Sequence, residues 1–193
     1  MGIIDDTRQS LSISRSGGIL RRYFVVNGFD GALTMLGLII GFLAGGSADL
    51  QVMINTCVAA AIALGMSGLS SAYVSEVAER KRELDQLQEA MITDLQDTAH
   101  GRAARRVPLL VALVNGAAPL CISLLILLPL WLARAGLPLP LEPLAMAIAT
   151  ALGCIFGLGL FLGRVGGTSP LGSGVKAVLI ALVTIGLVRL VGG

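Results

Sequence analysis

Charged residues are scarce in this chain, and they are almost absent from five long apolar segments. Only 13% of its 193 residues are charged, whereas 55% are hydrophobic. A soluble domain of this size needs a far more polar surface, so the composition excludes an ordinary soluble globular protein. The formal net charge is only +2, which gives no indication of nucleic-acid binding.

Residues that commonly build metal centres, disulfides and active sites are also few. There is one histidine, and Cys57, Cys121 and Cys154 each lie alone in a different apolar segment. This spacing argues against a zinc site or a disulfide framework, and it favours cysteines that act as small core residues. No nucleophile–base pair and no cofactor motif appears, so we expect neither an enzyme nor a bound cofactor.

Aromatic residues make up only 4% of the chain, while glycine is frequent. Small residues let membrane helices approach closely, so this combination suits a packed bundle of membrane helices. Gly37, Gly41 and Gly45 recur every four residues and predict a flat stripe for helix packing. The first twenty residues lack the apolar stretch of a signal peptide, so we expect residues 1–20 to form an uncleaved polar tail.

Five apolar segments with short connections predict an all-α protein with five transmembrane helices. Crossing a hydrocarbon core about 30 Å thick takes about 20 helical residues, and the segments have lengths of this order. We therefore predict one membrane domain over residues 21–193. The segments are expected near residues 23–45, 52–74, 107–132, 144–162 and 175–191.

A polar link at residues 75–105 separates the second and third segments and holds seven acids. We expect it to form a cytoplasmic amphipathic helix that ends near His100 and Gly101. At about 100° per residue, five acids share one face about 60° wide, beside an apolar stripe. They are either a cation-collecting face or an ordinary solvated face, partly neutralised by the neighbouring basic residues. These acids are Glu76, Glu79, Glu83, Asp94 and Asp97.

One acid, Asp30, lies inside the first apolar segment. At a helical rise of about 1.5 Å per residue, it lies about 12 Å along the helix from Arg22, inside the hydrocarbon core. An unpaired charge there costs at least ~2.5–3.5 kcal/mol on insertion scales, so such acids usually face a partner, a cavity or a pathway. Asn27 and Thr34 are predicted on the same helix face, which indicates a polar track. The alternative is a carboxyl that stays neutral or is tied to a neighbouring helix.

The distribution of Lys and Arg predicts the orientation in the membrane. Four lie in the N-terminal tail, six between the second and third segments, and two between the fourth and fifth. The loops on the other side hold only Arg134, and Arg189 lies near the end of the last segment. We therefore expect a cytoplasmic N-terminus, a cytoplasmic acidic helix and an external C-terminus.

Three stretches of the chain carry a family resemblance. NGFDGALTMLGLIIG, at residues 27–41, is similar to an opening pattern N-D-G-x-x-T-x-x-G-x-x-x-G, and NGAAPL, at residues 115–120, is similar to G-A-x-x-P. GLFLGRVGGTSPLGSGVKAVLIALVTIGLVRLVGG, at residues 159–193, follows G-x-x-x-G, then S-x-L-x-S-G and a closing glycine. Loosely over residues 20–193, and in the order of its elements, the chain resembles a shortened prokaryotic member of the vacuolar iron transporter family.

The resemblance implies a five-helix protomer and a homodimer whose ion path runs between the two first helices. By position, Asp30 is similar to the family's intramembrane carboxylate, and Met66 is similar to its second-helix methionine. The chain departs from the family at Ala72, where a glutamate is usual, and in a shorter cytoplasmic domain with Met91 alone. By placement, the first acids of that domain are Glu76, Glu79 and Glu83.

Two functions from different classes fit these observations. The first is a membrane transporter that exports Fe²⁺ or Mn²⁺ from the cytoplasm by proton exchange through a homodimer interface. Carboxylates suit hard divalent ions, and a thioether suits softer ones. The predicted transport pathway is Asn27, Asp30, Thr34 and Met66. The predicted metal ligands are Asp30, Met66, Glu76, Glu79, Glu83, Asp94 and Asp97.

The alternative is a non-transporting membrane scaffold or assembly factor whose acidic helix docks a partner protein. Both functions place the chain in a prokaryotic inner (plasma) membrane, surrounded by lipid and without nucleic acid. A divalent metal ion is the expected partner of the transporter, and a basic protein is that of the scaffold.

Overall fold

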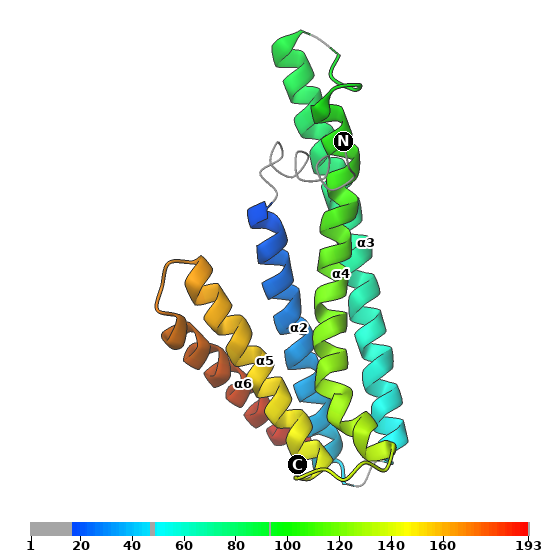
Figure 1. Cartoon of the computed structure of the whole chain (residues 1–193), viewed down its shortest axis with the longest axis vertical. Coiled ribbons are helices and arrows are strands. Elements are labelled where there is room, and N and C mark those ends of the chain that lie inside the picture. The colour runs from blue at the N-terminus through cyan, green and yellow to red at the C-terminus, as the bar shows by residue number, and fades with distance from the viewer. Residues whose placement is uncertain (1–16, 47–48, 93, 193) are drawn as a thin grey trace. The chain divides into compact units, whose positions relative to one another are not determined.

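The structure is a computed structural model that describes residues 17–46, 49–92 and 94–192. Over these ranges the regular secondary structure consists of five α-helices (Figure 1). Each of them is long and apolar enough to cross a membrane. The chain is therefore an integral membrane protein of the all-α class, as predicted. The helices are α2 (Gly17–Ala44), α3 (Leu50–Met91), α4 (Ala99–Arg134), α5 (Pro143–Val165) and α6 (Pro170–Gly192).

Three helices begin five or more residues before the predicted segments, and α4 is one of them, since it starts at Ala99 rather than near residue 107. Helix α2 starts at Gly17, so the end of the predicted tail is helical, while residues 1–16 of that tail lie outside the described residues. Helix α6 starts at Pro170, five residues before the predicted position. Its start has a local cause, because the backbone N–H of Gly172 donates to the Ser169 hydroxyl at 3.3 Å, and proline suits a first helical turn.

The predicted acidic helix is not a separate element. Helix α3 continues from the apolar segment through the acidic stretch and ends at Met91, and His100 and Gly101 lie in the first turns of α4. The predicted face of five acids on one helix is therefore wrong, because Asp94 and Asp97 lie in the connection after α3. In that connection, the Asp94 side chain accepts a hydrogen bond from the backbone N–H two residues later, at 2.9 Å, which favours a turn over a helix.

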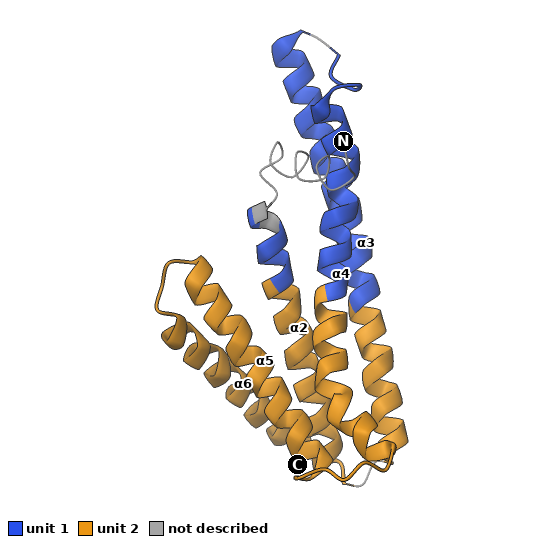
Figure 2. Cartoon of the chain, viewed as in Figure 1, with its two compact units in different colours: residues 1–24, 65–117 blue, residues 25–64, 118–193 orange. Residues whose placement is uncertain are grey.

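The chain divides into two compact units (Figure 2). Unit 1 comprises residues 1–24 and 65–117, so it holds the polar half of α3 and the first half of α4. Unit 2 comprises residues 25–64 and 118–193, so it holds most of α2, the rest of α3 and α4, and all of α5 and α6.

Unit 2 is built around one apolar core to which all five helices contribute. The largest fully buried side chains come from α2, α3, α4 and α5, while the buried residues of α6 in this core are alanines, with Ile185 and Val188 packed against it. Helices α5 and α6 form an antiparallel hairpin, visible in Figure 1. A Cβ added at Gly159 would lie 2.8 Å from the Gly174 Cα, and one at Gly163 would lie 2.7 Å from the Pro170 Cα. Glycine at these positions therefore permits the close approach of the two helices.

Unit 1 is held together by a similar close approach between α3 and α4. Asn115 is 4% exposed, and its side-chain amide donates to the Gly68 carbonyl at 2.6 Å. A Cβ at Gly68 would lie 2.9 Å from the Asn115 carbonyl oxygen, and one at Gly116 would lie 2.6 Å from the Gly65 carbonyl oxygen. Residue 119 is proline and has no N–H, so α4 itself supplies no i+4 donor to the Asn115 carbonyl.

Candidate functional site

Asp30 lies on a face of α2 that the rest of the chain leaves exposed. Within the described residues its carboxylate forms no hydrogen bond and no ion pair. A side of the helix about 100° away from Asp30 is packed tightly, since a Cβ at Gly31 would lie 2.6 Å from the Pro119 carbonyl oxygen of α4. This contact and the burial of Ala32 and Met35 set the rotation of α2 about its axis. Asp30 is consequently directed away from the core of unit 2.

The other predicted pathway residues of α2 follow the same side of the helix. Because α2 is continuous, Asn27 and Thr34 lie within one turn of Asp30 on either side, as predicted. Both are half-buried, and Asn27 already interacts with another group of the chain. Further along this face, a Cβ at Gly37 or Gly41 would meet no atom within 4 Å. Within the described residues, the predicted stripe is therefore not packed closely against another helix at Gly37 and Gly41, and Gly45 lies just after the end of α2.

A second charged group lies on the polar half of α3 in unit 1. The guanidinium of Arg80 contacts the Glu83 carboxylate at 2.6 Å and the Glu76 carboxylate at 3.2 Å. Arg80 and Glu76 are 6% and 7% exposed, so this ion pair is buried, while Glu83 is half exposed. The spacing of four and three residues places all three side chains on one side of α3. We refer to Glu76, Arg80 and Glu83 as the arginine clamp.

The arginine clamp changes the interpretation of the predicted acidic face. Two of its predicted ligands, Glu76 and Glu83, are brought together, but a guanidinium already lies between their carboxylates. Glu79 is exposed and makes no such contact within the described part of unit 1. An arginine four residues after one glutamate and three before another predicts this arrangement on a helix, so the pairing of Arg80 could have been identified from the sequence.

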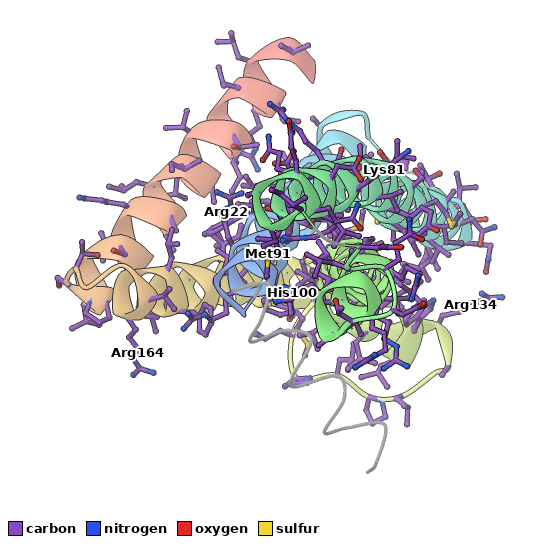
Figure 3. All side chains as sticks on the ribbon, turned by 90° about the horizontal axis from the view of Figure 1, so that it is seen from above. Arg22, Lys81, Met91, His100, Arg134 and Arg164 are labelled. Carbon is purple, nitrogen blue, oxygen red and sulfur yellow. The ribbon has the colours of Figure 1, made fainter. Side chains whose placement is uncertain are left out.

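Two pockets lie in unit 1, and one of them is lined by residues of the arginine clamp. One, of about 250 Å³, is lined by Arg80, Glu83 and His100 together with small and aliphatic side chains. The other, of about 400 Å³, is lined by Tyr73, Lys81 and residues of the connection and of α4. Figure 3 shows Lys81 on α3 and His100 at the start of α4. The sequence did not single out His100 as a lining residue, because it was expected at the end of a helix.

The remaining predicted ligands are dispersed. Met66 is 58% exposed on α3, and Asp94 and Asp97 are exposed in the connection after α3. Among the residues that the structure describes, no group of three or more His, Cys, Asp or Glu side chains is arranged to hold a metal ion. A single protomer therefore offers isolated carboxylates, of which Asp30 is the one inside an apolar span.

The chain was compared with known proteins. No family model matches it. It is similar to the uncharacterized protein MJ0645 of Methanocaldococcus jannaschii, with 30% identity over 164 residues. The matched region covers 83% of this chain and 82% of the archaeal protein, so the similarity extends over most of both chains.

Proposed function

The chain belongs to the family of the Methanocaldococcus jannaschii protein MJ0645, and we propose that it is a divalent-metal transporter that works as a homodimer. The observation that carries this proposal is the Asp30 carboxylate, which lies exposed and unpaired on an apolar helix. A carboxylate that faces lipid is costly, so a membrane protein keeps one at this depth only where something else compensates it. The resemblance to the vacuolar iron transporter family supports the same function.

A second copy of the chain would cover the exposed face of α2. Gly37 and Gly41 present no side chain, and no atom of the described residues lies within 4 Å of a Cβ added at either, so two α2 helices could approach closely there. In a twofold symmetric dimer the same face of each protomer meets its equivalent, so the two Asp30 residues would lie near the symmetry axis. Two carboxylates and the nearby Thr34 hydroxyls would then supply the oxygen ligands that a single protomer lacks.

Paired carboxylates in a membrane helix suit exchange of metal for protons. A carboxylate must be deprotonated to bind a metal ion, so metal and protons compete for the same oxygen atoms. Fe²⁺ and Mn²⁺ are the proposed substrates, and Met66 would favour the softer of the two if it contributes its thioether. The exposed acids of α3, Glu79 among them, would raise the local concentration of cations at the cytoplasmic end.

The decisive experiment is flux into proteoliposomes that contain an indicator for Fe²⁺ or Mn²⁺, with and without a proton gradient. We expect Asp30→Asn to reduce flux to the level of empty liposomes, because the neutral amide keeps the shape but loses the charge. Asp49→Asn is the matched control, since Asp49 is also an exposed acid but precedes α3, where asparagine can replace it as a helix cap. Undiminished flux in Asp30→Asn would refute the assignment of the pathway.

Export from the cytoplasm also requires the predicted orientation. The distribution of basic residues predicts that the connection between α2 and α3 lies outside. A cysteine at position 49, introduced into a variant that lacks the three natural cysteines, tests this prediction by labelling. We expect an impermeant thiol reagent to label the Asp49→Cys variant from outside intact cells. Labelling only after the cells are opened would reverse the proposed direction of transport.

The scaffold function stays an alternative that one observation favours. The polar half of α3 exposes apolar side chains beside its charges, with Val77 41% and Met91 57% exposed. Such a surface could bind a partner protein. The flux measurement distinguishes the two functions, because a scaffold would give no flux above empty liposomes for the unmodified chain.

A further inference from the structure

A pocket of about 310 Å³ lies in unit 2 among helices α2, α5 and α6. Phe29 and Leu33 of α2, Leu162 of α5 and Ile180 of α6 give it a mainly apolar wall. Its volume is near the lower end of the range for small-molecule pockets, about 300–1,000 Å³. It is not part of the proposed metal path, because Asp30 does not line it.

Two polar side chains of α6, Ser173 and Lys176, also line this pocket. With Ile180 they follow one another at helical spacing, so they lie on one face of α6. Lys176 lies about 9 Å from the first residue of α6, and Ile180 lies about 6 Å further along the axis. The pocket is therefore polar toward the beginning of α6 and apolar further along the helix. A lysine at this depth can extend its ammonium group toward the membrane surface.

Lys176 has no counter-charge in the structure. It is exposed and forms no ion pair or hydrogen bond within the described residues. The sequence from Pro143 to its end contains no aspartate or glutamate, so neither helix of the hairpin carries an acid. An anion that compensates this lysine therefore has to come from outside the hairpin, and lipid headgroups lie at the membrane surface toward which the ammonium group can extend.

We propose that this pocket is a binding site for an anionic phospholipid. The lipid phosphate accepts hydrogen bonds from the Lys176 ammonium and the Ser173 hydroxyl, and one acyl chain lies along the apolar wall. Basic pockets between membrane helices bind anionic headgroups on the cytoplasmic side, and the predicted orientation places the connection between α5 and α6 there. This inference does not depend on metal transport.

Native mass spectrometry of the purified full chain tests the headgroup. The protein is released from micelles with equal amounts of palmitoyl-oleoyl phosphatidylglycerol and palmitoyl-oleoyl phosphatidylcholine, which carry the same acyl chains. We expect the phosphatidylglycerol adduct to exceed the phosphatidylcholine adduct about fivefold, the effect of one basic residue near a membrane surface. Equal retention of the two lipids would overturn the proposal.

Charge variants locate the preference in the pocket. We expect Lys176→Gln to abolish it and Lys176→Arg to retain it, since both lysine and arginine bind phosphate. Arg164→Gln is the matched control, because it removes the same charge from the same hairpin without lining the pocket. Figure 3 shows the Arg164 side chain projecting away from the helices. An equal loss in Arg164→Gln would show a general charge effect and would overturn the pocket assignment.

Steric variants test the acyl chain and remain informative if Lys176→Gln fails to fold. Ile180 and Val183 are 59% and 62% exposed on α6, but only Ile180 lines the pocket. We expect Ile180→Trp to reduce retention of both lipids by at least about fivefold, the effect of losing more than one buried CH₂ group of the acyl chain, and Val183→Trp to leave it unchanged. Unchanged retention in Ile180→Trp would contradict the proposal.

A competition experiment separates a lipid from a free anion. Inorganic phosphate offers the same headgroup chemistry without an acyl chain, so we expect millimolar phosphate to leave the phosphatidylglycerol adduct in place. Displacement of the lipid by inorganic phosphate would show a site for the free anion and would overturn the lipid assignment.

Discussion

The two units differ in how their charged side chains are compensated. In unit 1 the buried Arg80 lies between Glu76 and Glu83, so the chain supplies its own counter-charges. In unit 2 neither Asp30 nor Lys176 has a charged partner within the described residues. A buried pair stabilises a fold only when both members are present, whereas an uncompensated charge in an apolar span calls for a partner from outside. We therefore interpret the buried charges of unit 1 as structural, and Asp30 and Lys176 of unit 2 as sites for external partners.

The largest effect on stability is expected from breaking the arginine clamp. Arg80→Met keeps the aliphatic stem but leaves Glu76 buried without its counter-charge, so we expect a loss of about 3 kcal/mol in unfolding free energy. Unfolding in detergent, followed by circular dichroism, measures the loss. Adding Glu76→Gln to Arg80→Met should restore most of it, because no buried charge then remains. Arg82→Met is the control, since Arg82 is exposed on the same helix. Equal losses in the two single variants would refute a structural role for the clamp.

A smaller loss of unfolding free energy is expected from a substitution where two helices lie close together at a glycine. The Cβ of Gly116→Ala would lie 2.6 Å from the Gly65 carbonyl oxygen, so α3 and α4 must separate, at a cost of about 1–3 kcal/mol.

Gly41→Leu should leave the protomer stable, because no atom of the described residues lies within 4 Å of a Cβ there. In the proposed dimer it should instead reduce self-association, measured by cross-linking in lipid. A stable, fully dimeric Gly41→Leu variant would contradict the proposed interface.

The hydrogen bond between α3 and α4 in unit 1 should contribute less to the unfolding free energy than the close packing at glycine does. Asn115→Ala removes the donor to the Gly68 carbonyl, and such bonds between membrane helices contribute about 0.6–2 kcal/mol. Thermal unfolding of Asn115→Ala beside Asn55→Ala gives the comparison, since Asn55 is exposed and bonds only to a neighbouring side chain. No difference between the two variants would mean that glycine packing alone holds α3 against α4.

The smallest effect is expected from an exposed acid of α3. Glu79→Gln should raise the apparent KM for metal about twofold or less, because an exposed charge acts only by attracting cations at a distance. The increase in apparent KM should disappear at about 1 M salt, where the Debye length is about 3 Å and charges further apart are screened from each other. Flux measured at two salt concentrations checks this. An increase that persists at high salt would indicate direct metal binding by Glu79 instead.

Much of the fold was predictable because hydropathy is a local property. The five spans could be located from composition alone, and α5 begins at Pro143, one residue before the predicted start. The prediction of a separate acidic helix after the second span was wrong for an equally local reason. The composition changes sharply at Ser75, but neither glycine nor proline lies between Ser75 and Met91, so a change of polarity does not end the helix. Asp94 and Asp97 were consequently assigned to a helix that they do not belong to.

The sequence by itself determined that this is a membrane protein and that Asp30 lies within an apolar span, because both follow from the order of residues along one helix. Only the tertiary structure decided which of its charges have partners. Whether Asp30 is covered depends on the rotation of α2, which the contact of Gly31 with Pro119 sets across a long sequence separation. Likewise, Lys176 borders an apolar pocket only because α6 packs beside α2 and α5. Contacts of this kind depend on which helices meet, and no local pattern of residues contains that information.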